Sequence, residues 1–244
     1  MNACYEVCTI FFFCVCQSRD NNHDVAWYVE SPCTCDYEYD VNDPQPYQHM
    51  PLWLKLFRQH LLKTLHLPLE SQLAPNSCFI NWYKNGNAGI DAHADDEILF
   101  EAEEYPCLII SFTLGAERLF QLWNLNENEP VNKRNRHTTL LRGDLCLRNM
   151  EYVTMQGMFQ KYFKHSIPRY DKAALNEEAI QKVTQKLRDE NARLRAMDEK
   201  VLREKVREEV VQHVGPRINF TWRWVTHHLE GCPLHRTNAN ASSN

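Results

Sequence analysis

The stretch RINFTWRW, Arg217–Trp224, constrains the fold more than any other feature of the sequence, because as a strand it has two unlike faces. Successive side chains in a strand point to opposite sides, so residues two apart share a face. Burying an unpaired charge is costly, so a buried strand of this kind needs an anionic partner for its polar face. The apolar face comprises Ile218, Phe220, Trp222 and Trp224, and the polar face comprises Arg217, Asn219, Thr221 and Arg223.

The separation of the two arginines limits what they can bind. Arg217 and Arg223 are about six residues apart, roughly 20 Å by strand rise, so they cannot hold one small group together. Guanidinium groups bind carboxylates through paired hydrogen bonds. We therefore expect the two arginines to hold different parts of one site, with the strand curving around it. The alternative is that both pair with ordinary Asp or Glu side chains of neighbouring strands.

Many short strands are predicted before this stretch, which is typical of a β-sandwich or barrel. A helix is predicted from Trp53 to Leu65, with apolar residues at helical spacing, and we expect it to pack on the sheet. Turn residues at Asn85-Gly86 and Arg142-Gly143-Asp144 separate the strands. The predicted strands are Ser77–Tyr83, Cys107–Leu114, Arg118–Leu122, Thr138–Leu141 and Asp144–Leu147.

Residues 171–213 contain no glycine, proline or aromatic residue and are rich in Glu, Lys, Arg and Ala, which predicts a helix. Its charges are balanced, which favours a solvated helix or a protein-binding helix over a nucleic-acid arm. We divide the chain into 1–75, an N-terminal segment with a supporting helix, and 76–170 with 215–228, the main β domain. The remainder comprises 171–214, a helical insertion, and 229–244, a flexible tail.

The composition is that of a soluble globular protein, with 43% hydrophobic residues, 24% charged residues and a net charge of -5. This balance argues against a broad basic nucleic-acid clamp but allows a local basic groove. The apolar run Val7–Cys16 is too short to span a bilayer and follows no basic segment, so it does not resemble a secretory signal. We expect a buried first strand there, or a chain start that lacks upstream sequence.

Ten cysteines are scattered along the chain. Their spacing does not resemble that of a disulfide-stapled miniprotein, so reduced thiols are expected. Cys33 and Cys35 follow a group of four cysteines at the start of the chain. A zinc site there stays open as an alternative, although no second C-x-x-C pair completes it.

A possible metal site is indicated by the stretch Ile90–Glu97. In an extended segment His93 and Asp95 project to the same side, as two ligands of one metal must. Two histidines and one carboxylate are the ligand set of non-haem Fe(II) oxygenases. His165 is the best placed third ligand, whereas we expect surface positions for His137, His227 and His228. A solvated acidic turn is the alternative reading of the H-x-D pattern.

Asn81 and Tyr83 share one face of a predicted strand ahead of His93. An amide and a phenol on an inward face can both donate hydrogen bonds to a bound oxyacid. This signal alone is weak, because tyrosine is common in strands.

Taken in order, these motifs resemble the AlkB family of Fe(II)- and 2-oxoglutarate-dependent dioxygenases, which demethylate alkylated nucleic-acid bases. The resemblance covers roughly residues 33–170 and 215–226, and the helical insertion departs from the usual family pattern. The matching motifs are Asn81-Trp82-Tyr83, His93-Ala94-Asp95-Asp96-Glu97, Arg142-Gly143-Asp144-Leu145, His165-Ser166-Ile167-Pro168 and the segment Arg217–Arg223.

The resemblance implies a mainly β fold with flanking helices, a double-stranded β-helix or jelly-roll barrel carrying a long helical insertion. It implies Fe(II) bound by His93, Asp95 and His165, with 2-oxoglutarate and O2 as cosubstrates and no catalytic residue beyond the metal centre. Arg217 would pair with the distal carboxylate of 2-oxoglutarate, and Arg223 would lie by the carboxylate near the metal. Further hydrogen bonds to this cosubstrate are implied for Asn81, Tyr83, Asn219 and Thr221.

The implied activity is oxidative demethylation of N-alkylated DNA or RNA bases, which releases formaldehyde, succinate and CO2, as in DNA repair by dealkylation or in RNA demethylation. A base must leave its stack to reach such a pocket. Asp96 and Glu97 are candidate base contacts, and the acidic, tyrosine-containing segment 36–44 resembles the family's nucleotide-recognition lid, with Tyr37 and Tyr39 as contacts.

The expected partner is single-stranded nucleic acid or a flipped base, in an intracellular, nuclear or cytoplasmic setting and without a membrane. A protein partner could bind through residues 171–214. The alternatives are a non-catalytic AlkB-like interaction module and a 2-oxoglutarate oxygenase that acts on protein or lipid.

Overall fold

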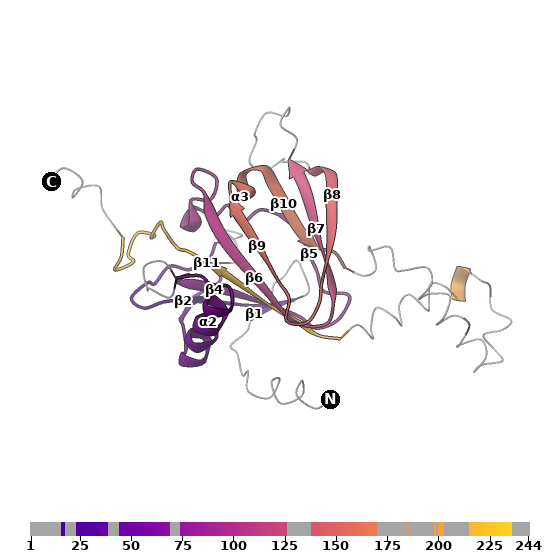
Figure 1. Cartoon of the computed structure of the whole chain (residues 1–244), viewed down its shortest axis with the longest axis horizontal. Coiled ribbons are helices and arrows are strands. Elements are labelled where there is room, and N and C mark those ends of the chain that lie inside the picture. Colours follow the sequence, from indigo (N-terminus) through magenta and orange to yellow (C-terminus); the bar gives the residue numbers. More distant parts are fainter. Residues whose placement is uncertain are drawn as a thin grey trace.

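The computed structural model describes residues 16–17, 23–38, 44–68, 74–125, 138–169, 185, 198, 200–202 and 215–235. In this part of the chain the strands form two sheets (Figure 1). The larger sheet has the order β1-β2-β4-β11-β6-β9, with β3 paired to β2, and the smaller sheet has the order β5-β10-β7-β8. The larger sheet contains strands from both ends of the described chain, so its core depends on contacts far apart in sequence.

Three strands of the larger sheet, β4, β6 and β11, begin at their predicted residues. Helix α2, Leu52–Thr64, begins one residue before its predicted position. The strands are β1 (Cys16–Gln17), β2 (Asp24–Val29), β3 (Tyr47–His49), β4 (Ser77–Tyr83), β6 (Cys107–Gly115), β9 (Tyr152–Gly157) and β11 (Arg217–Arg223).

The smaller sheet is built from the middle of the chain, and two short helices lie next to its strands in sequence. Its strands are β5 (Ile90–His93), β7 (Arg118–Leu125), β8 (Thr138–Leu147) and β10 (Phe163–Ile167), and the short helices are η1 (Ile98–Phe100) and α3 (Phe159–Tyr162).

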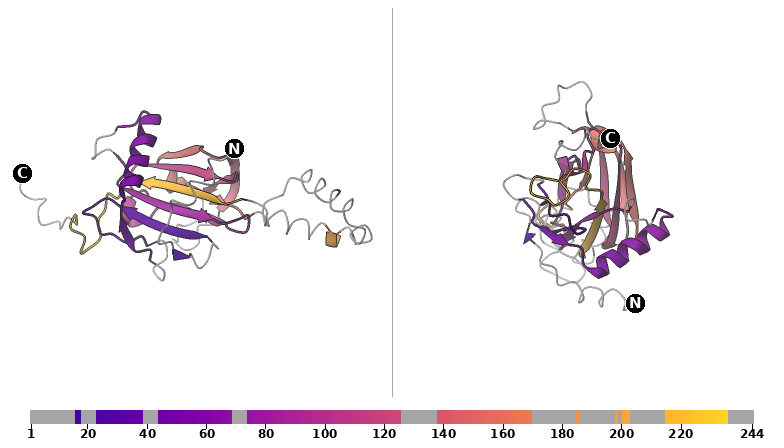
Figure 2. Two further views of the ribbon diagram at one scale, coloured as in Figure 1. Left: turned by 90° about the horizontal axis from the view of Figure 1, so that it is seen from below. Right: turned by 90° about the vertical axis from the view of Figure 1, so that its left-hand side faces the viewer.

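Strand β11 lies at the centre of the larger sheet, between β4 and β6 (Figures 1 and 2). Its apolar face carries Phe220 and Trp222, which are buried in one cluster with Leu54, Leu61 and Leu62 of α2. The cluster buries large apolar area, which is the main favourable term in folding. The predicted packing of this helix on the sheet is therefore confirmed, and the polar face of β11 is left to face the smaller sheet.

The predicted fold class, a mainly β jelly roll, is confirmed, but the two sheets do not close into a barrel within the described residues. The turn predicted at Arg142-Gly143-Asp144 is wrong, because one strand, β8, runs through it. Leu122 of β7 pairs with Gly143, and Trp123 pairs with Leu141, so Arg142 is an extra residue in the ladder. This arrangement is a β-bulge, which accommodates glycine within a continuous strand.

The predicted helical insertion, 171–214, lies almost wholly outside the described residues, and so do Tyr39, His137 and most of the run Val7–Cys16. The proposed division into four regions therefore stays a prediction. No helix in the described ranges has both the length and the apolar character that crossing a membrane requires.

Candidate active site

His93 and His165 lie opposite each other on the antiparallel strands β5 and β10 of the smaller sheet. Their ring centroids are 4.2 Å apart. Phe120 of β7 stacks on the His165 ring at 5.3 Å, which fixes the orientation of that imidazole. Two histidines far apart in sequence are therefore brought together by strand register, as the sequence predicted.

Asp95 follows β5 by two residues and is fully buried between the two histidines. Its Oδ1 lies 3.9 Å from Nε2 of His93, and its Oδ2 lies 3.8 Å from Nε2 of His165. The backbone N–H of Asp95 donates to the side-chain oxygen of Gln160 at 2.9 Å. Because Gln160 of α3 is itself fully buried, this contact holds the aspartate in position.

The two imidazoles are in the form that binds a metal. His93 Nδ1 lies 2.9 Å from the Asp91 carbonyl oxygen, which can only accept, so Nδ1 carries the proton and Nε2 presents its lone pair. Burial lowers the pKa of His93, and burial together with the neighbouring His93 lowers the pKa of His165 to about 3. Both rings are therefore neutral at physiological pH.

The donor set fits one metal ion. The donor atoms of His93, Asp95 and His165 all lie within 4.8 Å of one another. Asp95 Oδ2 is buried without a hydrogen-bond partner among the described residues, which is costly unless a cation binds it. Two imidazoles and one carboxylate on one side of a metal leave further coordination positions open, as Fe(II) oxygenases require.

Arg223, at the end of β11, donates a hydrogen bond to Asp95 Oδ1. Its guanidinium also lies over the rings of Phe100 and Tyr37, at 5.1 and 5.3 Å from their centroids. Although burial opposes charge, Asp95 raises the pKa of Arg223. Burial raises the pKa of Asp95, but Arg223, His165 and His93 together lower that pKa below its usual value. Arg223 thus has a carboxylate partner within the protein, while its Nε and Nη1 are buried without acceptors among the described residues. Its expected place beside the cosubstrate stays a prediction.

Arg217, at the other end of β11, has no carboxylate partner among the described residues. It is 1% exposed, and its Nη2 donates to Thr113 Oγ1 and to Asn219 Oδ1, both at 2.9 Å. Its Nε and Nη1 are buried without acceptors in the part of the chain that the structure describes. Burial lowers the pKa of Arg217 to about 10, so the group remains charged at neutral pH. A buried guanidinium of this kind fits an anionic ligand.

The remaining polar side chains of β11 form one hydrogen-bonded row. Asn219 Oδ1 also accepts from Ser111 at 3.0 Å and from Thr113 at 3.3 Å. Asn219 Nδ2 donates to Thr221 Oγ1 at 2.8 Å. Asn219 and Thr221 are buried near Arg217, so their predicted place beside the cosubstrate is compatible with the structure, although the hydrogen bonds described here are to protein groups.

Asn81 and Tyr83 of β4 are buried on the same side as Arg217, whose guanidinium lies 5.1 Å from the Tyr83 ring centroid. The His23 ring stacks on the Tyr83 ring, with their centroids 5.1 Å apart. Nε2 of His23 lies 3.0 Å from Oδ1 of Asn81. Thus the structure brings Asn81 and Tyr83 to the Arg217 end of the site, as expected.

The predicted substrate contacts fall beside the metal ligands. The Tyr37 hydroxyl donates to Glu97 Oε1 at 2.5 Å, and its ring is buried against Trp27, Phe79 and Phe100. A base that approached this region would therefore meet Glu97 or the partly exposed Asp96 before the Tyr37 ring. Tyr39 lies outside the described residues.

Burial, with Asp95 nearby, raises the pKa of Glu97 to about 8. At neutral pH this carboxyl group is largely protonated. In the metal-free chain it can therefore donate a hydrogen bond as well as accept one.

The sequence analysis did not identify His23, Ser111, Thr113 or Gln160, all of which contact candidate site residues. Ser111 and Thr113 alternate with apolar residues in β6, and this alternation could have placed them on the polar face opposite β11. Gln160 and His23 gave no such signal, because their roles depend on a short helix and on a segment distant in sequence.

Comparison with known proteins agrees with this geometry. The family model of the 2OG-Fe(II) oxygenase superfamily matches residues 14–223. The alpha-ketoglutarate-dependent dioxygenase alkB homolog 3 of Mus musculus is 26% identical over 147 residues, covering 59% of this chain and 45% of that protein. The Rattus norvegicus protein of the same name is also 26% identical over 147 residues, which cover 59% of this chain and 43% of the rat protein.

The chain thus spans less than half the length of these curated relatives. A solved structure described as "The structure of OsALKBH1" is also similar, with a TM-score of 0.43 and 14% identity over 85% of this chain and 81% of that chain.

Proposed function

Because the chain belongs to the 2OG-Fe(II) oxygenase superfamily, we propose that it is an oxidative demethylase of N-alkylated bases in DNA or RNA. The observation that carries the proposal is the presence of two buried features, one at the smaller sheet and one on the polar face of β11. One is the buried His93, Asp95 and His165 donor set, and the other is the buried Arg217 with unsatisfied guanidinium nitrogens. A metal and a dicarboxylate ligand would satisfy both.

His93, Asp95 and His165 would hold the Fe(II). When bound, this metal with 2-oxoglutarate and O2 supplies the oxidising chemistry, which yields succinate and CO2 and hydroxylates an N-methyl group that then leaves as formaldehyde. The chain itself keeps both imidazoles neutral and the carboxylate ionised. Gln160 and Arg223 orient Asp95 by hydrogen bonds to its backbone N–H and to Oδ1.

Arg217 would bind the distal carboxylate of 2-oxoglutarate. Thr113 and Asn219 accept bonds from only one of its nitrogens, Nη2, so Nη1 and Nε remain for the ligand. A charge-assisted bond in a buried site is stronger than one in water, which favours tight binding. Arg223 differs from the family expectation in one respect, because its Nη2 donates to Asp95, so that only its Nε and Nη1 remain for a cosubstrate.

The substrate class rests on the resemblance to the AlkB family and on the groups next to the metal ligands. Asp96 and Glu97 follow Asp95 directly, and their carboxyl groups can form hydrogen bonds with a base edge. The substrate would be a single-stranded base or a base flipped out of its stack. The setting would be intracellular.

The test is formaldehyde release from single-stranded oligonucleotides that carry 1-methyladenine, 3-methylcytosine or 6-methyladenine, in DNA and RNA form. We expect release that requires Fe(II) and 2-oxoglutarate and that is lost in His93→Ala. A matched control is His60→Ala, on the exposed face of α2, which should retain activity. Turnover of 2-oxoglutarate without release from any methylated base would contradict the proposed substrate class and leave the oxygenase assignment standing.

The same protein preparation can distinguish a demethylase from the alternative, a non-catalytic AlkB-like interaction module. A functional site binds Mn(II) and N-oxalylglycine and is stabilised by them through mass action. Absence of any shift in the melting temperature would favour an interaction module.

A further inference from the structure

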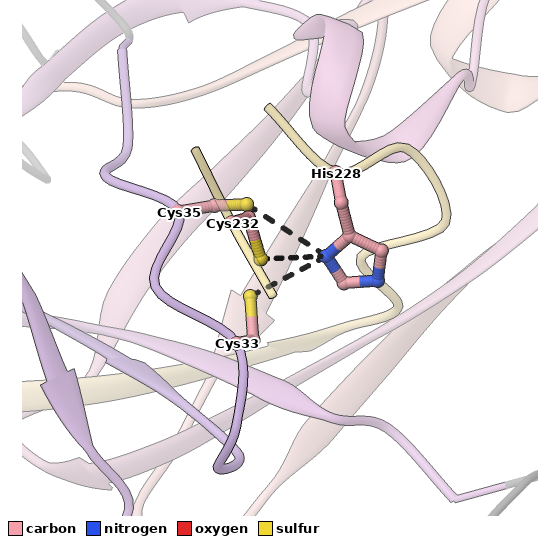
Figure 3. A group of neighbouring side chains, drawn as sticks. All are labelled: Cys33, Cys35, His228 and Cys232. Carbon is pink, nitrogen blue, oxygen red and sulfur yellow. Dashed lines mark hydrogen bonds between the residues drawn. The ribbon is translucent and has the colours of Figure 1, made fainter. Parts of the chain in front are cut away.

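We propose that the chain binds a second metal, a structural zinc ion, through Cys33, Cys35, His228 and Cys232 (Figure 3). This site is separate from the His93 cluster and takes no part in the proposed reaction. Cys33 and Cys35 come from the segment that leads to Tyr37, and His228 and Cys232 come from the segment that follows β11. The ion would therefore join two parts of the chain that are far apart in sequence.

The distances between donor atoms match those of a tetrahedral zinc site. Figure 3 shows three sulfur atoms turned toward Nδ1 of His228, and these lie 3.5 Å (Cys33), 3.7 Å (Cys35) and 3.6 Å (Cys232) from it. Zinc bonds of about 2.3 Å to sulfur and about 2.0 Å to nitrogen, at tetrahedral angles, place sulfur and nitrogen about 3.5 Å apart. The three distances equal this tetrahedral edge to within about 0.2 Å.

The chemistry of the donors also fits zinc. Three thiols and one imidazole form a Cys₃His set, which is a common closed site for structural zinc. His228 and Cys232 are separated by three residues, a spacing usual for one half of such a site, and Cys33-x-Cys35 supplies the other half. A search for a second C-x-x-C pair does not find this half of the site, because His228 and Cys232 form an H-x-x-x-C pair.

Burial distinguishes this group from surface thiols. Cys33, Cys35 and Cys232 are 3%, 1% and 7% exposed, and none of them is in a disulfide. Buried thiols that serve only as small apolar groups have no reason to converge on one imidazole nitrogen. His228, expected at the surface from the sequence, is only partly exposed and directs Nδ1 into the group.

Backbone groups are arranged to support thiolate ligands. The N–H of Thr34 donates to the Cys232 sulfur at 3.5 Å, and the N–H of Leu229 donates to the Cys35 sulfur at 3.3 Å. Each segment therefore supplies an N–H donor to a sulfur of the other segment. Hydrogen bonds of this kind hold metal ligands in position and stabilise their charge.

The site is attached to rigid structure on both sides. The carbonyl of Cys35 accepts from the Trp27 indole at 2.9 Å, and His235 Nδ1 lies 2.6 Å from the His228 carbonyl oxygen. Cys33, Cys35 and Cys232 belong to one core cluster with Tyr37 and Val225. The zinc ion would thus hold the segment after β11 against the core that supports the Tyr37–Glu97 contact.

The first test is metal content. The full chain, produced in zinc-supplemented medium and kept reduced, is dialysed against a weak chelator and analysed for zinc, iron and copper. We expect about one zinc ion per chain, falling to less than about a tenth in Cys33→Ser and in Cys232→Ser. The matched control is Cys146→Ser, at an exposed thiol in β8, which should retain the zinc. Zinc content that is equal in all four proteins would overturn the proposal.

An Asp95→Ala variant separates this site from the proposed iron centre. Zinc retained in Asp95→Ala and lost in Cys232→Ser supports the second site. Zinc lost in Asp95→Ala and retained in Cys232→Ser would show that the ion occupies the His93 cluster, and the proposal would then be wrong. The proposed demethylase activity can fail without affecting either result.

A measurement on the unsubstituted chain covers the case in which the cysteine variants do not fold. Co(II) added to the reduced, metal-free protein should give the intense visible bands of tetrahedral cobalt and a thiolate charge-transfer band, and zinc should abolish both. Removal of zinc should also increase hydrogen exchange at 33–37 and 226–235 more than in β11. Cobalt spectra without a thiolate band, or exchange that is unchanged in both segments, would contradict the site.

Discussion

Arg118 and Arg217 are both buried, each 1% exposed, and both lie over the ring of Tyr83, but their polar partners differ. Arg118 donates to the backbone carbonyls of Ala88, Pro168 and Asn85 at 2.6, 2.8 and 3.3 Å. Arg217 has two nitrogens without acceptors in the described part of the chain. Arg118 therefore binds backbone groups of the fold, whereas the nitrogens of Arg217 without acceptors support the proposed ligand contact.

This difference predicts opposite effects of the same substitution. Arg217→Met should leave the free energy of unfolding unchanged or higher, because it removes a buried charge and Asn219 Oδ1 keeps its bonds from Ser111 and Thr113. Its affinity for N-oxalylglycine in the presence of Mn(II) should fall about 10- to 100-fold. Calorimetric titration and chemical unfolding measure the two quantities.

Arg118→Met is the matched control. It leaves three carbonyl groups without their donor, so we expect a loss of about 2 to 4 kcal/mol in unfolding free energy. If Arg217→Met loses stability as Arg118→Met does and still binds N-oxalylglycine with the affinity of the unsubstituted chain, Arg217 is a structural residue and the proposed ligand contact is wrong.

Gln160 is predicted to be a positioning residue for the metal site. Its side-chain oxygen accepts from the backbone N–H of Asp95, so Gln160→Leu, similar in size, should lower Mn(II) affinity about 10-fold or more. Electron paramagnetic resonance titration of free Mn(II) measures this affinity. Gln160→Glu, which keeps an acceptor oxygen, should restore much of it. Equal Mn(II) affinity in all three proteins would show that the contact has no part in metal binding.

The raised pKa of Glu97 predicts that the free energy of unfolding depends on pH when no iron or manganese is added. Burial raises its pKa to about 8, above the unfolded value near 4.5, so the folded chain holds a proton that the unfolded chain releases between these values. Stability from this group is full below about pH 4.5 and is lost as pH rises through about 8. Glu97→Gln keeps an acceptor for Tyr37 and removes this titration.

We therefore expect Glu97→Gln to gain stability relative to the unsubstituted chain as pH rises from 5 to 8, by at most about 1.4 kcal/mol per pH unit. Urea unfolding at each pH gives the values. Glu104→Gln, at an exposed glutamate, serves as the control. A difference between Glu97→Gln and the unsubstituted chain that is constant over this range would mean that Glu97 is ionised in the folded state.

Local patterns in the sequence were sufficient to predict β4, β6 and β11, whereas β5 and β10, which carry His93 and His165, were not predicted as strands. The alternation in Arg217–Arg223 predicted both faces of β11, and H-x-D predicted that His93 and Asp95 act together. These predictions succeed because side-chain direction in a strand follows from sequence position alone. The Arg142-Gly143-Asp144 turn was wrong because glycine and aspartate occur both in turns and in bulges, and pairing with β7 decides between them.

Contacts between distant segments could not be predicted in this way. The pairing of Cys33 and Cys35 with His228 and Cys232 depends on how the segment after β11 returns to the core near Trp27. The contact of Gln160 with Asp95 depends on a helix of four residues. In both cases the residue types are common, and only the three-dimensional arrangement gives them a role.

The central claim is that His93, Asp95 and His165 bind one metal while Arg217 holds the far end of a dicarboxylate. A crystal structure of the chain with Mn(II) and N-oxalylglycine tests it most directly. We predict one manganese ion within bonding distance of His93 Nε2, His165 Nε2 and a carboxylate oxygen of Asp95. We also predict hydrogen bonds from Arg217 to the distal carboxylate of N-oxalylglycine. Manganese bound elsewhere, or a distal carboxylate that points away from Arg217, would contradict the account.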